Sequence, residues 1–573
     1  MKAAEYLIKK LEELGINDFF GLPGDYNFEI INAVQENENT KWINCTNELN
    51  AGYAADGYAR EKGYGAIITT YGVGELSAMN AIAGSYAENV PVINIVGAPN
   101  SQLLEERKLI HHQFSNPEPY AFIESFNPVT QAAAFLTRDN AKIEIDRVLK
   151  AFVKEKKPVY ICIPQDIAQL EISDKDVDYG WLSDRDALKT VTEKISEKIK
   201  NSEHPIILAD VLTRRFNAVR ELKTFVKKSE IPVTNFVMGM GIIDSDYKNY
   251  LGTYLSDYGN SSAKKYLETT DCLIAVGNIY SDVNSLGFKL PYNINSHIAI
   301  YGTYTYVDGV KYENVKMSDI LRELSETVES KGYNFEKSEL GCDEVEAGGE
   351  LTSDYIYSKL QGFLKEDDII FSDTGSAFYG MFGLKLPKNT SFNIQALWCS
   401  IGWATPAVFG AGMAKPNSRI VLVTGEGAHQ ISAMEVGNML KYGLKPVIVV
   451  INNSGYTIER MLSGKYDNEF NDIVSINYSK LARIFDGDIW STRVDTAEDF
   501  EKALRVTAIM KKLCYVEACV EKMDSPAMAK AFLCGNKIEQ PKKKYKQKKE
   551  EKLSKNTDSK YSTIVHESLQ IEE

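Results

Sequence analysis

Short apolar runs that alternate with helical patterns are the feature that most limits how this chain can fold. Each run has the length of a strand, and amphipathic or small-residue stretches separate consecutive runs. Strands that alternate with helices are typical of βαβ units, which build parallel sheets covered by helices. The runs form three sets, at residues 18–21, 66–70, 92–96 and 159–163, then 206–209, 272–276 and 298–301, then 369–372, 420–423, 447–451 and 515–519. The sequence therefore predicts an α/β protein with three doubly wound parallel-sheet domains.

Changes in composition between these sets indicate the domain limits. A polar stretch at 171–186 and a stretch rich in Glu and Gly at 330–351 are typical of linkers. They predict domains at 1–175, 190–335 and 352–540. Residues 541–573 are poor in apolar side chains and rich in Lys, Glu and Ser, so we expect a disordered tail. Its basic run at 542–549 has no apolar face and is followed by Glu550 and Glu551, which favours a solvated segment over a membrane-binding or nucleic-acid-binding one.

Composition limits the classes of function. The chain has 573 residues, enough for several domains, and its 65 Lys and Arg against 79 Asp and Glu leave a net charge of −14. That charge disfavours binding to a phosphate backbone, and no apolar run is long enough to span a membrane. We therefore expect neither a nucleic acid nor a membrane as partner. The N-terminal MKAAEYLIKKLEELGI has acidic residues within an amphipathic pattern, unlike a secretory signal or a transit peptide, so we expect a cytoplasmic protein. The eight cysteines are scattered without a C-x-x-C pair, as in reduced core thiols.

The most informative segment is 421–460, VLVTGEGAHQISAMEVGNMLKYGLKPVIVVINNSGYTIER. It predicts a strand that ends in Gly425-Glu426-Gly427, a helix, and a second strand that ends in Asn452-Asn453. Parallel strands end at one edge of the sheet, where glycines and a helix N-terminus favour a phosphate group. Glu426 and Asn453 would supply oxygen ligands of the kind that Mg²⁺ prefers. A nucleotide-dependent dehydrogenase is disfavoured, because no Gly-x-Gly of the chain has a third Gly three residues on and no Walker lysine motif occurs.

This segment resembles the metal motif of the thiamine-diphosphate-dependent enzymes, which opens with Gly-Asp-Gly and closes with Asn-Asn; here Glu426 takes the place of the Asp. Further motifs resemble the pyruvate and indolepyruvate decarboxylases of that family. They are GLPGDYNFEI at 21–30, NELNAGYAADGYAR at 47–60, TTYGVGELSAMNAIAGSYAE at 69–88, the pair His111-His112, and GYTIE at 455–459. The resemblance extends to about residue 540. It implies a pyrimidine-binding, a central and a diphosphate-binding domain, and the non-oxidative decarboxylation of a 2-oxo acid to an aldehyde and CO₂ with thiamine diphosphate and Mg²⁺.

The resemblance also implies roles for single residues. Glu48, which in isolation reads as an ordinary acidic residue after an Asn helix cap, corresponds to the glutamate that protonates the aminopyrimidine ring. Four further side chains would transfer protons in the active site: Asp25, His111, His112 and Glu459.

Further positions match the part of the family site that holds the cofactor. Thr374 and Ser376 would lie beside it, the backbone of Cys399 would accept from its amine, and Ile401 would wedge between its two rings. The remaining cofactor positions are Gly427, Ala428 in place of the usual Ser, Asn453, Gly455 and Ile458, and the implied metal ligands are Glu426, Asn453 and Gly455.

The positions that match the substrate end of the decarboxylase site are all apolar: Val283, Phe378, Ile458, Leu462 and Phe532. Val283 stands where pyruvate-specific members have a bulky aromatic residue, and the space this opens suits a longer side chain. Phe378 and Phe532 offer aromatic faces. We therefore expect branched-chain or aromatic 2-oxo acids, such as phenylpyruvate or indolepyruvate, to be preferred over pyruvate.

In this family the pyrimidine end of the cofactor is bound by one subunit and the diphosphate by another, which implies a homodimer with shared active sites and, by resemblance, a homotetramer. Two alternatives stay open. One is a carboligase that forms acyloins, and the other is a regulator with the same fold whose metal site is impaired by Glu426. The presence of every proton-transfer residue argues against the regulator.

Overall fold

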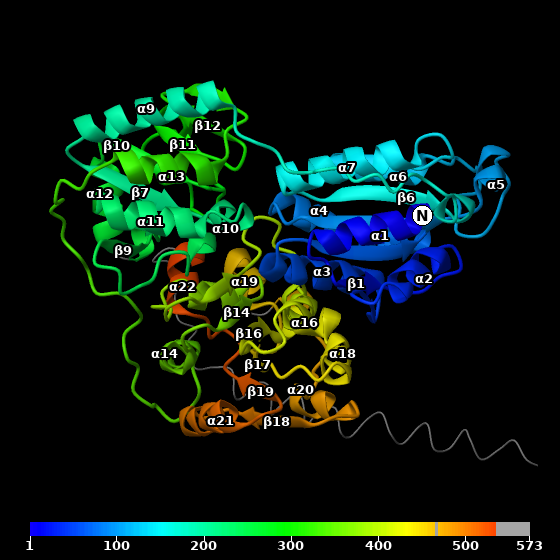
Figure 1. Cartoon of the computed structure of the whole chain (residues 1–573). Helices are drawn as coiled ribbons and strands as arrows, with labels where there is room; N and C mark the ends of the chain where they lie inside the picture. Colours follow the sequence, from blue (N-terminus) through cyan, green and yellow to red (C-terminus); the bar gives the residue numbers. More distant parts are fainter. Residues whose placement is uncertain (260, 465–467, 535–573) are drawn as a thin grey trace, which may run out of the picture.

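The computed structural model describes residues 1–259, 261–464 and 468–534, and it contains three sheets with helices packed around them (Figure 1). The tail predicted for 541–573 lies outside these residues. The chain passes from the first sheet to the second between α8 and α9, and from the second to the third between α13 and α14. We keep 1–175, 190–335 and 352–540 as proposed domain limits, of which residues 535–540 are not described.

The first sheet is parallel throughout, with the strand order β2-β1-β3-β4-β6-β5. Its strands are β1 (Asp18–Gly21), β2 (Lys41–Asn44), β3 (Gly65–Thr70), β4 (Val92–Ala98), β5 (Ala132–Phe135) and β6 (Val159–Pro164). Its helices are α1 (Ala3–Glu13), α2 (Phe28–Glu36), α3 (Glu48–Lys62), α4 (Val73–Ala87), α5 (Ser101–Glu105), α6 (Ala121–Phe126), α7 (Ala141–Glu155) and α8 (Gln165–Ala168). The central strands are buried along their whole length, because α1, α2 and α7 belong to the core on one face and α3 and α4 to the core on the other.

The second sheet is mixed, with the order β13-β12-β11-β10-β7-β8-β9. Its strands are β7 (Pro205–Ala209), β8 (Val233–Asn235), β9 (Tyr250–Thr253), β10 (Cys272–Val276), β11 (Ile298–Ile300), β12 (Tyr304–Val307) and β13 (Val310–Glu313). Its helices are α9 (Arg185–Asn201), α10 (Leu212–Arg215), α11 (Val219–Ser229), α12 (Ser261–Thr269) and α13 (Met317–Thr327). β12 pairs antiparallel with β11 and with β13, whereas the other strands of this sheet pair in parallel as predicted. The β12–β13 hairpin has a local reason: Asp308 and Gly309 between these strands both have positive φ, and such a two-residue turn joins antiparallel strands.

The third sheet is parallel, with the order β15-β14-β16-β17-β19-β18. Its strands are β14 (Ile369–Ser372), β15 (Ser391–Asn393), β16 (Ile420–Gly425), β17 (Val447–Asn452), β18 (Ile489–Val494) and β19 (Leu513–Cys519). Its helices are α14 (Ser353–Phe363), α15 (Ser376–Met381), α16 (Ala404–Ala414), α17 (Glu426–Ser432), α18 (Glu435–Lys441), α19 (Thr457–Ser463), α20 (Tyr478–Leu481), α21 (Ala497–Ile509) and α22 (Ala527–Cys534). The predicted α/β class with three sheets dominated by parallel strands is confirmed.

Helices α3 and α16 join the first domain to the third. A Cβ atom added at Gly57 would lie 2.0 Å from the carbonyl oxygen of Ala407, and one added at Gly410 would lie 1.8 Å from that of Ala54. The two helix backbones are therefore in direct contact, which only glycine permits at these positions. Residues of both helices belong to one apolar core, so the two domains pack as one unit.

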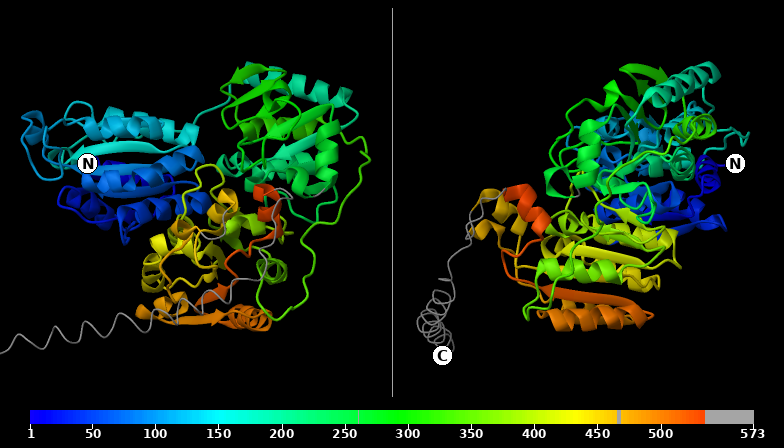
Figure 2. Two further views of the ribbon diagram at one scale, coloured as in Figure 1. Left: turned by 180° about the vertical axis from the view of Figure 1, so that it is seen from behind. Right: turned by 90° about the vertical axis from the view of Figure 1, so that its left-hand side faces the viewer.

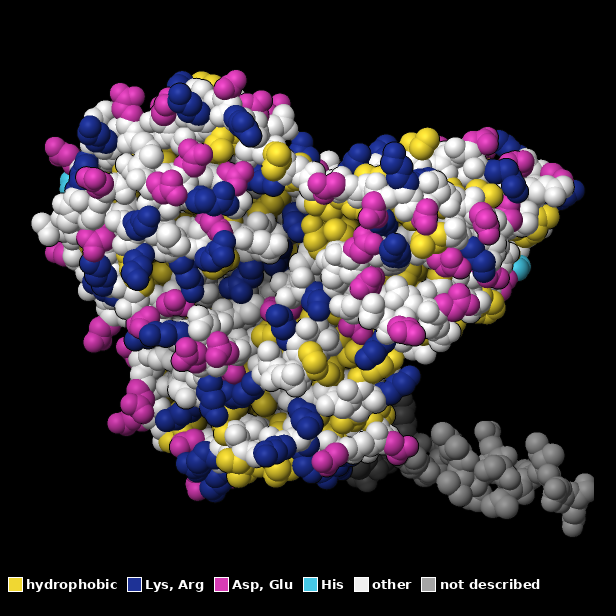
Figure 3. All heavy atoms as spheres, viewed as in Figure 1, with side chains coloured by type: hydrophobic (Ala, Val, Ile, Leu, Met, Phe, Trp, Pro, Cys, Tyr) yellow, Lys and Arg dark blue, Asp and Glu magenta, His cyan; other side chains and the backbone are white. Residues whose placement is uncertain are grey.

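The surface drawn in Figure 3 carries basic and acidic side chains interspersed over all three domains. On this face neither sign forms the continuous stripe that a nucleic-acid-binding surface shows. In the described part of the chain no helix is both long enough and apolar enough to cross a bilayer.

Candidate active site

Three of the predicted proton-transfer residues form one cluster at the carboxyl end of the first sheet. Asp25 follows β1, and the two histidines follow α5. Nε2 of His111 lies 2.8 Å from Oδ2 of Asp25, and the hydroxyl of Tyr26 lies 3.2 Å from Nδ1 of the same ring. The rings of Tyr26 and His111 stack at 4.8 Å, and the rings of His111 and His112 meet edge to face at 4.7 Å. The structure thus brings together residues that are far apart in the sequence.

The glycines after β3 lie close to both the histidine loop and Glu48. A Cβ atom at Gly72, where φ is +66°, would lie 2.0 Å from the carbonyl oxygen of His112. A Cβ atom at Gly74 would lie 3.3 Å from Oε1 of Glu48. Glu48 is the first residue of α3, and the helix is capped by Asn47, whose Oδ1 accepts from the N–H of Asn50 at 2.8 Å. The half-buried Glu48 carboxylate therefore lies on the same side of the sheet as the histidine loop.

The second group of predicted site residues lies at the carboxyl end of the third sheet and includes Glu426, the first residue of α17. Its side chain is only 2% exposed, and Oε1 accepts from the N–H of Gly455 at 2.6 Å. Burial raises the pKa of Glu426 to about 7, although the hydrogen bond from Gly455 acts in the opposite direction. The long side chain thus reaches the loop after β17, which also carries Asn453, and the predicted ligands Glu426 and Gly455 are in direct contact.

Arg460, which sequence reasoning missed, fixes that loop. Its fully buried guanidinium donates to the carbonyl oxygen of Ser454 at 2.6 Å, to that of Asn453 at 3.4 Å and to Oδ1 of Asp472 at 2.7 Å. A Cβ atom at Gly455, where φ is +135°, would lie 2.1 Å from the carbonyl oxygen of Asn471. No local signal could have identified Arg460, because an Arg in a short helix ordinarily lies in solvent.

Asp373 and Glu88 support the loops that carry the predicted cofactor residues. The buried Asp373 carboxylate accepts from the N–H of Thr374 at 2.9 Å, and burial raises the pKa of Asp373 to about 7. Glu88, fully buried and paired with Arg60, accepts from the N–H of Leu397 at 2.9 Å. Asp373 thus positions the loop that precedes Ser376, and Glu88 positions the loop that precedes Cys399 and Ile401. Gly427 and Ala428 lie buried in the first turn of α17.

Four of the five predicted substrate positions lie in the third domain, and Val283 lies in the central domain after β10. Phe378 in α15 is only 2% exposed and belongs to the core, where its ring packs on Tyr379 at 4.6 Å. The ring of Phe532 in α22 lies 5.6 Å from that of Tyr379. Val283 and Ile458 are partly buried against the same core, whereas Leu462 in α19 is 58% exposed.

The two groups of site residues are separate within one chain. Among the described residues, no hydrogen bond or ion pair joins the cluster at Asp25 to Glu426, Asn453 or the exposed Glu459. Helix α5, next to the histidine loop, lies at the outer end of the first domain, whereas α19 lies near the centre of the molecule (Figures 1 and 2). Within one chain, the two groups of predicted site residues therefore lie apart.

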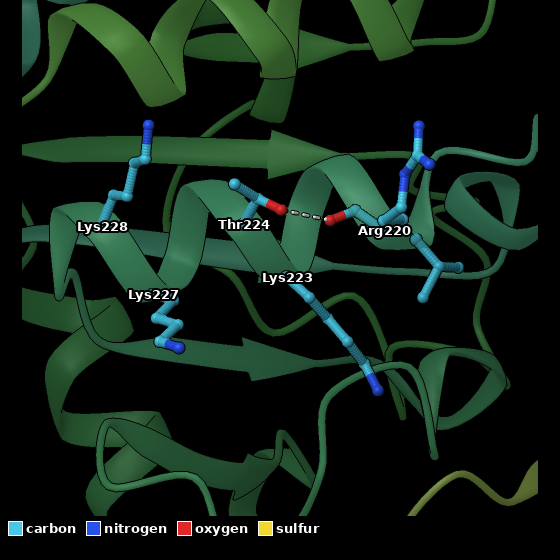
Figure 4. Close-up of a pocket in the computed structure, with 6 residues that line it drawn as sticks. Arg220, Lys223, Thr224, Lys227 and Lys228 are labelled. Atoms are coloured by element: carbon cyan, nitrogen blue, oxygen red, sulfur yellow. Dashed lines mark hydrogen bonds between the residues drawn. The ribbon is translucent and has the colours of Figure 1, made fainter.

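A hollow of about 880 Å³ on the surface of the central domain lies along α11 (Figure 4). It is lined by Val219, Arg220, Lys223, Thr224, Lys227 and Lys228. Lys223 pairs with Asp244 at 3.0 Å and Arg220 with Glu221 at 2.8 Å, so acidic groups already neutralise part of its charge. None of the predicted site residues lines it.

Comparison with known proteins identifies the three domains. The N-terminal thiamine pyrophosphate (TPP) binding domain of the thiamine pyrophosphate enzymes matches residues 1–118, their central domain matches 192–317, and their C-terminal TPP binding domain matches 373–518. The two matched binding domains carry the two groups of site residues.

Relatives extend this match along nearly the whole chain. An alpha-keto-acid decarboxylase of Mycobacterium leprae is 34% identical, over 92% of this chain and 94% of its own length. Pyruvate decarboxylase isozyme 1 of Saccharomyces cerevisiae is 32% identical, over 91% of this chain and 96% of its own length. Pyruvate decarboxylase isozyme 3 of the same yeast is 33% identical, over 84% of this chain and 88% of its own. This chain therefore belongs to the thiamine-diphosphate-dependent 2-oxo acid decarboxylases.

Proposed function

We propose that this protein converts 2-oxo acids with branched or aromatic side chains to aldehydes and CO₂, in preference to pyruvate, and that it requires Mg²⁺ besides thiamine diphosphate. The observation that carries the proposal is the pairing of Asp25 with His111 at the strand ends of the matched TPP-binding domain, where the loop after β3 also approaches Glu48. Relatives that act on alpha-keto acids and on pyruvate, by their names, support the reaction class.

The donor groups at the third sheet fit Mg²⁺. Glu426, the side chain of Asn453 and the backbone of Gly455 offer oxygen atoms, which are the ligands that this ion prefers. The longer carboxylate still reaches the loop after β17, where Oε1 of Glu426 accepts from the Gly455 N–H at 2.6 Å. Burial favours the neutral carboxylic acid form of Glu426, and this group would lose its proton when the ion binds. Thiamine diphosphate, when bound, supplies the nucleophilic carbon and the electron sink for decarboxylation.

The residues of the first domain would move protons around that chemistry. The hydrogen-bonded pair of Asp25 and His111 is open to solvent, with 49% and 58% of the two side chains exposed, so it can exchange protons with water. Glu48 lies close to Gly74 at the strand ends, where it would hold a proton for a group bound there. Glu459 is exposed on α19 and belongs to the other half of the site.

A second copy of the chain would join the two half-sites. Apolar side chains are exposed near both halves: Phe28 and Val73 in the first domain, and Ile431 and Met434 around α17. Such side chains are typical of a protein interface. We propose a homodimer with shared active sites that pairs further into a homotetramer, and a cytoplasmic location. Sedimentation velocity tests the assembly, and a monomer that is fully active would exclude it.

Substitution of Glu48 tests the function directly. Glu48→Gln should bind thiamine diphosphate as the parent does and turn over about 100-fold more slowly or worse, the scale of a lost proton transfer. Glu38→Gln, an exposed glutamate of the same domain, is the matched control and should be unaffected. Unchanged turnover in Glu48→Gln would refute the assignment.

Substrate preference requires a separate measurement. We expect kcat/KM for 2-oxoisovalerate, 2-oxoisocaproate, phenylpyruvate and indolepyruvate to exceed that for pyruvate, by about 10- to 200-fold at most for each methylene accommodated. Val283→Phe should fill the added space and shift the preference towards pyruvate. A parent that prefers pyruvate, or a variant whose preference is unchanged, would contradict the role of Val283.

Two other functions can be distinguished from decarboxylation. Product analysis with pyruvate and acetaldehyde would reveal an acyloin if the protein is a carboligase. A calorimetric titration with thiamine diphosphate and Mg²⁺ would show no binding if the protein is a regulator with an impaired metal site.

A further inference from the structure

Asp25, His111 and His112 have the composition of a transition-metal site. Each offers one ligand atom, and the three atoms lie within 4.8 Å of one another. We infer that these three side chains bind a divalent transition-metal ion, with Zn²⁺ as the best match, and that the bound ion blocks proton transfer. Only this blocking effect rests on the proposed function.

The donor set distinguishes this site from the proposed Mg²⁺ site. Two imidazole nitrogens and one carboxylate oxygen suit Zn²⁺, and three protein ligands leave a fourth position for water. Mg²⁺ prefers oxygen ligands alone, which are what Glu426, Asn453 and Gly455 offer. The two ions should therefore prefer different places, and excess Mg²⁺ should keep the oxygen site filled.

The distances suit the ion after small side-chain movements. Zn²⁺ bonds of about 2.0–2.2 Å in a tetrahedron place any two ligand atoms about 3.4 Å apart. In the cluster the separations range from 2.8 Å, between Asp25 and His111, up to 4.8 Å. Asp25 and His111 are about half exposed, so their side chains can move by the remaining distance without disturbing the core.

The surroundings of the cluster orient the two imidazoles. The Tyr26 hydroxyl contacts Nδ1 of His111 and leaves Nε2 facing Asp25, an arrangement in which a second group fixes the metal-facing nitrogen. Nδ1 of His112 is buried and has no hydrogen-bond partner among the described residues. The His112 backbone, with φ of +68°, is held where its carbonyl oxygen packs on Gly72.

A bound ion would take up the lone pairs that proton transfer needs. An imidazole nitrogen that is bonded to a metal cannot accept a proton, and a carboxylate oxygen bonded to the ion is a weaker base. Zn²⁺ at this cluster should therefore inhibit decarboxylation, and a chelator should restore it.

The test is a titration of the holoenzyme, loaded with thiamine diphosphate and excess Mg²⁺, with Zn²⁺ by calorimetry and with Co²⁺ by visible absorption. We expect one ion for each chain. His111→Gln, His112→Gln and Asp25→Asn should each weaken binding at least about tenfold. His204→Gln, which removes an exposed histidine outside the cluster, is the matched control and should bind as the parent does.

Three results would overturn the inference: no saturable binding, binding unchanged in both histidine variants, or an intense thiolate band in the Co²⁺ spectrum, which would indicate cysteine ligands. The outcome is separable from that of the proposed function. If Zn²⁺ binds as expected to a protein that decarboxylates no 2-oxo acid, the metal site stands and the function fails. If the protein decarboxylates 2-oxo acids but Zn²⁺ neither binds nor inhibits it, the function stands and the metal site fails.

Discussion

Glu426→Gln tests how burial controls the proposed metal site. The substitution removes a carboxylate that is 2% exposed, keeps the shape of the side chain, and leaves an amide oxygen to accept the hydrogen bond from Gly455. It therefore separates the effect of charge from that of packing.

The magnitude follows from the pKa of Glu426, which burial raises from 4.5 to about 7. This rise corresponds to about 3 kcal/mol of lost stability, because the unfolded chain ionises this group at a lower pH than the folded protein does. Below about pH 4.5 the carboxyl group is neutral in the folded and the unfolded chain, and the loss is absent. Between about pH 4.5 and 7 the unfolded chain gives up this proton while the folded protein still holds it, so the loss grows across this range and is complete above about pH 7.

We therefore expect metal-free Glu426→Gln to be more stable than the parent by up to about 3 kcal/mol at about pH 8 and equally stable at about pH 4.5. Urea unfolding in the presence of a chelator, repeated across this pH range, measures the difference. Mg²⁺ should then stabilise the parent and not the variant. Glu469→Gln, at an exposed position, is the control and should show no such pH dependence. A Gln variant no more stable than the parent at pH 8 would refute the reasoning.

Three further substitutions test the same loop. Glu426→Asp, which restores the shorter carboxylate, should bind Mg²⁺ and cofactor at least as well as the parent in a calorimetric titration; a clear loss would show that the loop is adapted to Glu. Gly455→Ala should weaken cofactor binding about tenfold or more, because its Cβ would lie 2.1 Å from the Asn471 carbonyl oxygen at a strained φ; unchanged affinity would contradict this. Arg460→Met should lower the free energy of unfolding by about 3 kcal/mol or more, since buried carbonyls lose a charged donor. The control is Arg505→Met, at an exposed ion pair, which should change the free energy of unfolding by less than about 0.5 kcal/mol. If both variants lower the free energy of unfolding equally, the role of Arg460 is contradicted.

The sequence alone predicted features that depend on neighbours along the chain. Alternating apolar and helical segments predict three α/β domains, because the period of a strand and that of a helix are local properties. The antiparallel pairing of β12 with β13 also has a local signal, because Asp308-Gly309 is a typical two-residue hairpin turn. The motifs that contain Asp25 and Glu48 identified the family, and the comparisons confirmed it.

The tertiary structure decided what depends on residues far apart in the sequence. Asp25 meets His111 across 86 positions, and Glu426 meets Gly455 across 29. The raised pKa of Glu426 and the buried guanidinium of Arg460 arise from the removal of water and from partners on other loops. Such effects require a packed interior, because desolvation and long-range hydrogen bonds exist only after distant segments come together.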